Sequence, residues 1–381
     1  MRSIRQELAV GPETGDSAAA ILEDVLGHLM DGLRAQEFGA KQVALPDVAL
    51  TNSLLKLAEA LLRERKRHEL EVRKAQALQD ANYLDLVNQG NMDLAVSSVV
   101  TRRGSTSTAT AKAATGAVRE LQTLEDKFDS TDAFFAAGNL SITAILAAFV
   151  HSAVWTLAGV LAASGATLAE MALRARMTEH LAPMRTPETD ALEQDGHWVL
   201  PPHGSVLEHV YDTGKGQWIR SDKLVPPFHM VLGASFKDLT VVTPEGFAMR
   251  DIMGRLLAND SHVMLLGGTG SGKTALIRMF LNDPPSNLTH EATPAKPGDE
   301  PISDDSVNSL HVIEASLSMQ MTPDKLQTMI EGHLVKVRRR TWGPPAGLNS
   351  VFFVDDLAAA GPGEALARRE RPMMLVSRRV S

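Results

Sequence analysis

The 381-residue sequence contains no cysteine, so it forms no disulfide and offers no thiolate metal ligand. Basic residues are fewer than acidic ones, 38 against 46, and the formal net charge of -8 gives no electrostatic support for a nucleic-acid partner. The first seven residues lack the apolar core of a signal peptide. These absences are typical of a cytosolic globular protein. With 44% hydrophobic residues, the chain has enough apolar side chains to bury a sizeable core in two units.

One stretch without charge, residues 142–166, is long enough to cross a bilayer as a helix. It is rich in alanine rather than leucine, carries His151 and several hydroxyl side chains, and contains Gly159 and Gly165. These residues lower the tendency to insert into a membrane. We therefore interpret the stretch as a buried core helix and expect no membrane partner, with a membrane-spanning helix as the alternative.

Helical periodicity organises the first part of the chain. Apolar residues recur at three- and four-residue spacing over residues 21–33 and again over 50–61, where the preceding Asp47 suits a helix N-cap. The mixed charges of residues 63–74 predict a solvated helix face. Residues 101–116 are low in complexity and too small and polar to pack, so they predict an exposed insertion.

The most specific motif is G-x-x-x-x-G-K-T at residues 267–274. It follows the apolar run 263–266, which predicts a strand, and precedes a helical pattern over 275–280. Glycines suit such a loop because backbone amides must approach phosphate oxygens without an intervening Cβ. The motif predicts a nucleotide site for ATP and Mg²⁺, in which Lys273 reaches the β and γ phosphates and Thr274 binds the metal. The predicted nucleotide-binding residues are Gly267, Gly268, Thr269, Gly270, Ser271, Gly272, Lys273 and Thr274.

A pair of carboxylates follows a second predicted strand. Residues 350–354 predict a buried parallel strand that ends at Asp355 and Asp356, a Walker B pattern. Asp355 is the candidate Mg²⁺ ligand, and Asp356 stands where hydrolysing members of this class carry a Glu that orients the attacking water. The Asp carboxylate falls about 1.5 Å short, a displacement that costs about a hundredfold in rate. The pattern therefore favours nucleotide binding over fast turnover, with Asp356 and Lys273 as candidate catalytic residues.

The order of these motifs resembles dynein heavy chain of the axonemal type, from the end of its second AAA+ module into its third. The third module of that family has a phosphate loop, a Ser-rich turn after a strand, a Thr-x-x-x-x-Gln helix, a basic helix end, Gly-Pro-Pro and a Val-Asp-Asp-Leu strand end. The corresponding residues here are 267–274, 314–318, 322–327, 336–340, 343–345 and 354–357. Upstream, residues 202–226 are similar to the family's connector, 149–159 to its apolar helix, and 45–62 to the lid of its second module.

The resemblance implies an α/β fold, with a mostly helical N-terminal part followed by an incomplete P-loop AAA+ parallel-sheet module. It implies an ATP-binding segment of a motor for microtubule-based movement of cilia or flagella, with regulatory ATP binding and slow hydrolysis. The expected partners are other dynein modules and dynein light and intermediate chains, with microtubules bound only through regions absent here. The expected location is the cytoplasm, cytoskeleton and axoneme.

The expected domain organisation combines these patterns with the resemblance. It comprises a disordered tail at 1–18, a helical region at 19–190 with a low-complexity insertion near 75–120, a connector at 191–230, a partial third AAA+ module at 231–357 with a loop insertion near 283–305, and a divergent tail at 358–381.

The sequence also departs from the family pattern. Val241-Val242-Thr243 replaces a Val-Pro-Thr turn near the adenine, residues 358–360 are Ala-Ala-Ala instead of Asn-Met-Pro, and residues 361–381 do not resemble the family. The strands and lid that follow Walker B in AAA+ modules do not fit in that tail, so we expect a fragment or a truncated gene model. Two alternatives remain open, a stand-alone P-loop ATPase with its own sensor residues and a non-catalytic helical scaffold protein.

Overall fold

The structure is a computed structural model, and several long segments lie outside the residues that it describes. The described residues are 12–43, 45–88, 141–185, 187–228, 241–284, 310–318, 321, 323–338, 341–343 and 350–356. They divide into a helical unit, Met1–Pro227 with Thr243–Ala248, and a glycine-loop unit, Phe228–Val242 with Met249–Ser381. Helix α11 (Pro244–Leu257) contributes its first residues to the helical unit and the rest to the glycine-loop unit.

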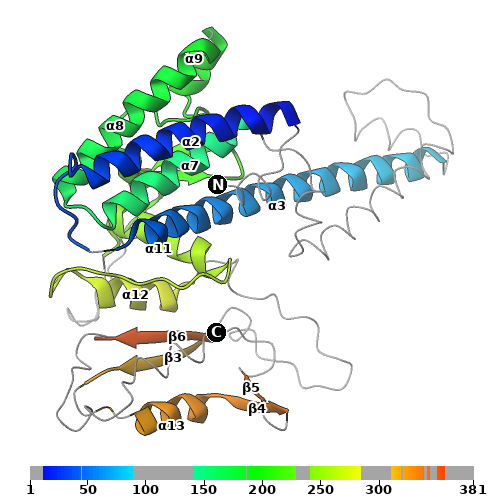
Figure 1. Cartoon of the computed structure of the whole chain (residues 1–381). Helices are drawn as coiled ribbons and strands as arrows, with labels where there is room; N and C mark the ends of the chain where they lie inside the picture. Colours follow the sequence, from blue (N-terminus) through cyan, green and yellow to red (C-terminus); the bar gives the residue numbers. More distant parts are fainter. Residues whose placement is uncertain are drawn as a thin grey trace. The chain divides into compact units, whose positions relative to one another are not determined.

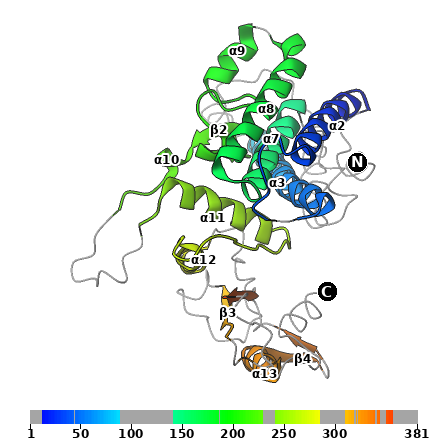
Figure 2. The same ribbon diagram turned by 60° about the vertical axis from the view of Figure 1, so that its left-hand side comes forward.

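Four helices form the core of the helical unit. Helices α2 (Pro12–Arg34), α3 (Asp47–Asn88), α7 (Ile142–Ala158) and α8 (Ala163–Leu181) lie side by side in both ribbon views (Figures 1 and 2). The apolar stripes predicted over residues 21–33 and 50–61 are buried, which confirms both helices. Helix α7 contacts α2, α3 and α8, and this central position explains why it carries so few polar residues.

The uncharged stretch 142–166 is two helices rather than one. Ser141 caps α7 by accepting a hydrogen bond from the amide of Ala144, and α7 ends at Ala158 before Gly159. After a short turn, α8 begins and brings Gly165 so close to Phe38 that a Cβ would lie 2.2 Å from its carbonyl oxygen. Among the helices that the structure describes, none combines the length and apolarity needed to cross a membrane.

Two predicted boundaries in this unit were wrong. Helix α2 begins at Pro12, inside the predicted tail 1–18, because proline presets the helical φ and lacks an amide that the first turn would leave unpaired. Helix α3 continues to Asn88, inside the predicted insertion 75–120. Residues 75–88 contain no glycine or proline and are rich in alanine, leucine and glutamine, which are good helix formers. The rest of both segments lies outside the described residues.

A compact connector follows the helices. It contains η1 (Ala182–Met184), α9 (Pro187–Gln194), η2 (Val206–Glu208), the antiparallel strands β1 (His209–Asp212) and β2 (Gln217–Arg220), and α10 (Ser221–Leu224). Trp218 anchors it, because its ring lies 5.0 Å from that of Tyr211 and its indole nitrogen donates to the carbonyl oxygen of Trp198 at 2.9 Å. All three side chains are buried.

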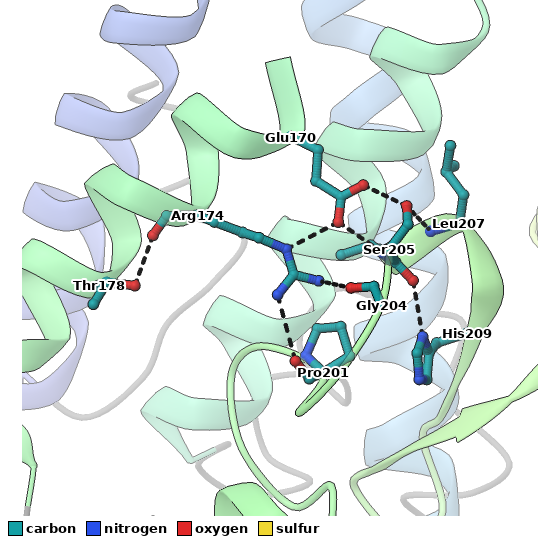
Figure 3. Close-up of polar contacts among 9 residues, drawn as sticks. Glu170, Arg174, Thr178, Pro201, Gly204, Ser205, Leu207 and His209 are labelled. Atoms are coloured by element: carbon teal, nitrogen blue, oxygen red, sulfur yellow. Dashed lines mark hydrogen bonds and ion pairs between the residues drawn. The ribbon is translucent and has the colours of Figure 1, made fainter. Parts of the chain in front are cut away.

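Glu170 on α8 joins this connector to the helices through hydrogen bonds (Figure 3). Its buried carboxylate accepts hydrogen bonds from the Ser205 hydroxyl at 2.5 Å, the Val206 amide at 2.8 Å and the Arg174 guanidinium at 3.0 Å. Arg174 in turn donates to the carbonyl oxygens of Pro201 and Gly204. The buried charge is therefore paired and fully engaged, which is the condition under which proteins tolerate one.

The glycine-loop unit is a small α/β assembly. It contains α12 (Lys273–Asn282), β3 (His311–Ser316), α13 (Pro323–His333), β4 (Val335–Arg338), β5 (Thr341–Gly343) and β6 (Ser350–Asp355). Strands β3 and β6 are parallel, with Ser316 opposite Asp355. Helices α12 and α13 lie on either side of the pair (Figure 1). The α/β fold class and the strand predicted over residues 350–354 are confirmed.

The core of this unit lies on both faces of the strand pair. Leu326 on α13 packs with Ala315 and Leu317, and Phe352 and Val354 of β6 lie against the same cluster. Because side chains alternate along a strand, Phe353 and Asp355 face the other way, and Asp355 contacts Thr274 of α12 on that face. This alternation places the carboxylate that ends β6 on the same face as the helix that follows the glycine loop.

Two element predictions in this unit were wrong. Residues 263–266 form no strand, because β3 and β6 pair with each other and no described strand lies alongside this run to accept its hydrogen bonds. Val263 and Leu265 nevertheless pack against the core pair Met253 and Phe280. The basic run beginning at Lys336 lies in β4 rather than at a helix end, because the flanking valines favour a strand and β5 supplies a partner. Residues 285–309, 339–340 and 357–381 lie outside the description.

Candidate functional site

The glycine loop, residues 267–272, leads directly into the N-terminus of α12. Gly270 has φ of 78° and Gly272 has φ of 82°, in the left-handed region where only glycine is unstrained. A Cβ at either position would meet nothing within 4 Å, so these glycines are required by the backbone conformation rather than by crowding. The loop side chains are exposed, and the first amides of a helix favour an anion.

Lys273 folds back over this loop. Its ammonium group donates to the carbonyl oxygens of Gly267 at 2.9 Å and Gly268 at 2.6 Å, and lies 3.3 Å from the hydroxyl of Ser271. Its positive charge is thus held beside the loop backbone. A phosphate group bound there would exchange these carbonyl contacts for stronger charge-assisted ones.

Thr274 and Asp355 are brought together although 81 residues separate them. The Thr274 hydroxyl lies 3.1 Å from Oδ2 and 3.3 Å from Oδ1 of Asp355. Asp355 Oδ1 also accepts the backbone amide of Asp356 at 3.0 Å, which limits rotation of the carboxylate. A hydroxyl and a carboxylate side by side are oxygen ligands of the kind that Mg²⁺ prefers.

The side chain of Asp356 takes no part in these contacts. Its φ is 52°, a left-handed conformation that Asp adopts more readily than most residues, and its side chain is exposed. Within the described part of the chain, its carboxylate makes no hydrogen bond or ion pair with the glycine loop. The structure therefore joins Lys273, Thr274 and Asp355 to the loop region but does not bring Asp356 into contact with them.

The comparisons with known proteins match this region. The profile of the family described as P-loop containing dynein motor region matches residues 228–293 and 302–365. Over these residues the chain is similar to a segment of a dynein heavy chain. Dynein axonemal heavy chain 1 of Rattus norvegicus is 27% identical over 177 residues, which are 45% of this chain and 3% of that protein.

Other dynein heavy chains match this chain at a similar identity and over a similar part of its length. Dynein axonemal heavy chain 1 of Homo sapiens is 25% identical over 216 residues, 55% of this chain and 4% of that protein. The ciliary dynein beta chain of Heliocidaris crassispina is 27% identical over 158 residues, 42% of this chain and 3% of that protein. The chain thus spans only a small fraction of the length of each dynein heavy chain that it matches.

Arg278 and Glu314 were not among the predicted site residues. Arg278 lies one helical turn after Thr274 on α12, and its guanidinium is 2.8 Å from the carboxylate of Glu314 on β3. The hydrogen bond to Glu314 raises the pKa of Arg278, and the nearby charge of Asp355 raises it further. The four-residue spacing from Thr274 was a usable signal for Arg278, whereas the sequence holds no local signal for its partner.

Proposed function

We propose that this dynein segment binds ATP with Mg²⁺ and serves as a regulatory nucleotide site of an axonemal dynein motor. The observation that carries the proposal is the contact between the Thr274 hydroxyl and the Asp355 carboxylate directly behind the glycine loop. The dynein P-loop family is a nucleotide-binding family in general, and the donor groups here match the chemistry of a magnesium-bound triphosphate.

Each candidate residue has a distinct part in this proposal. The amides of the glycine loop and the N-terminus of α12 would bind phosphate oxygens, and Lys273 would move from the Gly267 and Gly268 carbonyls to the β and γ phosphates. Thr274 and Asp355 would hold Mg²⁺, directly or through water. When bound, the metal neutralises phosphate charge and fixes the orientation of the phosphate chain.

The geometry supports binding more than turnover. Asp356, the candidate for orienting an attacking water, is a short carboxylate on a left-handed backbone and does not contact the loop. A water that is held out of line with the phosphate reacts slowly, because displacements of about 1 Å cost on the order of a hundredfold in rate. Slow hydrolysis suits a site whose occupancy regulates another.

A fluorescent ATP analogue tests the proposal in the full chain. We expect saturable, Mg²⁺-dependent binding, and about a ten- to hundredfold loss of affinity in Lys273→Ala, because a charge-assisted contact disappears. Lys336→Ala is the matched control, since it removes an equal charge from the exposed strand β4 of the same unit. Equal binding by wild type and Lys273→Ala would overturn the proposal.

Thr274→Val distinguishes binding of the metal from binding of the phosphate groups. Valine matches threonine in shape but lacks the hydroxyl that faces Asp355. We expect Thr274→Val to lose most of the enhancement of binding by Mg²⁺ while its thermal unfolding stays close to that of wild type. A variant that keeps full Mg²⁺ dependence would remove Thr274 from the proposed metal ligands.

We further propose that the protein acts in ciliary or flagellar movement, together with other dynein modules and dynein light and intermediate chains. The axonemal names of the related heavy chains support this location. A tagged copy expressed in ciliated cells is expected in the salt-extractable axonemal fraction together with dynein subunits. Recovery only in the detergent-soluble fraction would contradict it. Assignment of residues 231–357 to a third AAA+ module is part of the same proposal.

A further inference from the structure

The helix after the glycine loop contacts the strand pair at two polar points, one turn apart. Thr274 meets Asp355 on β6, and Arg278 meets Glu314 on β3. Residues four apart on a helix share one face, so Arg278 lies on the same side of α12 as the proposed metal-binding threonine. The cation on this face is therefore placed near the Mg²⁺ ligands.

The strand register brings the two carboxylates onto one face as well. Ser316 lies opposite Asp355, and Glu314 is two residues earlier on the same strand, so its side chain points to the same side. Arg278 forms an ion pair with Glu314, and the charge of Asp355 also raises the pKa of Arg278. Both members of the pair are half exposed, at 59% and 45%, so each side chain has room to change partner.

We propose that Glu314 is a positioning residue that keeps Arg278 away from Asp355 and thereby sets the affinity of the site for the magnesium–nucleotide complex. The inference rests on the proposed nucleotide function and assigns a role within the same site. A carboxylate that accepts hydrogen bonds from a guanidinium offers fewer free lone pairs to a metal ion. Glu314 holds the guanidinium and so leaves Asp355 available.

Charge removal at the two positions then acts in opposite directions. Without the Glu314 charge, the charge of Asp355 still attracts Arg278, and we expect the guanidinium to turn toward it. Without the Arg278 charge, Glu314 adds an unpaired negative charge beside Asp355 and attracts a divalent cation. A pair that merely joins α12 to β3 would instead weaken the site in both cases, because either substitution removes the same contact.

Mg²⁺ titration of fluorescent ATP binding by the full chain distinguishes these cases. Glu314→Gln is expected to raise the half-saturating Mg²⁺ concentration about three- to fivefold, and Arg278→Gln to lower it by a similar factor, as suits partly exposed charges. The double variant is expected within about twofold of wild type. Thermal unfolding without nucleotide reports folding, and little change is expected because the pair is exposed.

The outcomes separate this inference from the function on which it rests. If wild type shows no Mg²⁺-dependent binding that Lys273→Ala abolishes, the proposed function fails. If wild type binds but both single variants shift in the same direction, or neither shifts, the positioning role of Glu314 is overturned. Arg278→Lys provides a second check, because it keeps the charge and should stay close to wild type.

Discussion

Arg176 on α8 donates two hydrogen bonds to Asp24 on α2, one to each carboxylate oxygen, at 2.7 and 3.0 Å. The two residues are 152 positions apart, and His180, one turn further along α8, lies 2.7 Å from the same carboxylate. The hydrogen bonds from Arg176, and then from His180, lower the pKa of Asp24 to about 2. This contact joins α2 to α8, and a long segment outside the described residues lies between the two helices in the sequence.

The Asp24 contact makes the helical unit sensitive to acid. Because the pKa of Asp24 is lower in the folded state than its usual 3.8, its contribution to stability is complete above pH 4 and disappears as the pH falls through about 2. We expect the melting temperatures of wild type and Asp24→Asn to differ by a constant amount above pH 4 and to converge near pH 2. Three of the four tryptophans lie in this unit and report its unfolding.

Asp31→Asn is the matched control for this experiment. It removes an exposed carboxylate from the same helix, where Asp31 forms an i,i+3 pair with Arg34. We expect its melting temperature to stay close to that of wild type, because an exposed surface pair contributes little to stability. A difference between wild type and Asp24→Asn that stays constant down to pH 2 would contradict the assigned role of Asp24.

Removal of the Glu170 carboxylate is expected to destabilise the helical unit strongly. Glu170→Ala leaves the Ser205 hydroxyl, the Val206 amide and one side of Arg174 without their acceptor in a buried place. Unsatisfied buried donors of this kind cost about 2–4 kcal/mol of unfolding free energy in total. Denaturant unfolding followed by tryptophan emission measures the loss.

The comparison for Glu170 is Glu179→Ala on the same helix. Glu179 is 68% exposed and pairs with Arg176 at the surface, so its removal should cost below about 1 kcal/mol. Equal losses in the two variants would mean that the connector is not held by the Glu170 contacts.

Lys66 on α3 makes the stability of the helical unit depend on pH a second time. Its effect has the opposite sign to that of a lysine whose pKa is raised by an ion pair. Burial lowers the pKa of Lys66 to about 8, against the opposing charge of Glu69. Between pH 8 and 10 the unfolded chain then binds more protons than the folded one, so stability rises with pH. We expect the melting temperature of wild type to rise relative to Lys66→Met across this window.

The Lys66 measurement should stop at pH 10. Burial raises the pKa of Tyr211 to about 12, so the folded state keeps a proton that the unfolded state loses, and stability falls above pH 10. A constant difference between wild type and Lys66→Met from pH 8 to pH 10 would rule out titration of Lys66 in that range.

Two substitutions of Asp356 test its backbone conformation and its proposed role in hydrolysis. Asp356→Val forces a β-branched residue into φ of 52° and is expected to cost about 1–2 kcal/mol, whereas Asp356→Asn suits that backbone and should be neutral. We expect Asp356→Asn to bind the fluorescent ATP analogue within about twofold of wild type and to lose hydrolysis instead. Loss of binding in a folded Asp356→Asn protein would assign Asp356 to the binding site itself.

Local patterns in the sequence predicted the parts of the site that lie close together along the chain. The spacing of glycines, Lys273 and Thr274 defines a loop and the helix that follows it, because turn conformation and helix initiation depend on residues within one turn. The apolar run of residues 350–354 likewise predicted β6 and the position of Asp355 at its end. The order of these motifs was enough to identify the dynein resemblance.

Only the tertiary structure decided which distant groups meet and which extended segments become strands. Arg278 reaches Glu314 and Asp24 reaches Arg176 because packed helices and strands set those distances, and no local pattern encodes them. The contact of Thr274 with Asp355 was expected from their two motifs, and packing supplies its geometry. A strand also exists only where a neighbour accepts its hydrogen bonds, so the valines around Lys336 pair with β5 while the apolar run 263–266 forms no ladder in the described structure. The sequence by itself thus determined the local elements and their chemistry, and packing determined their partners.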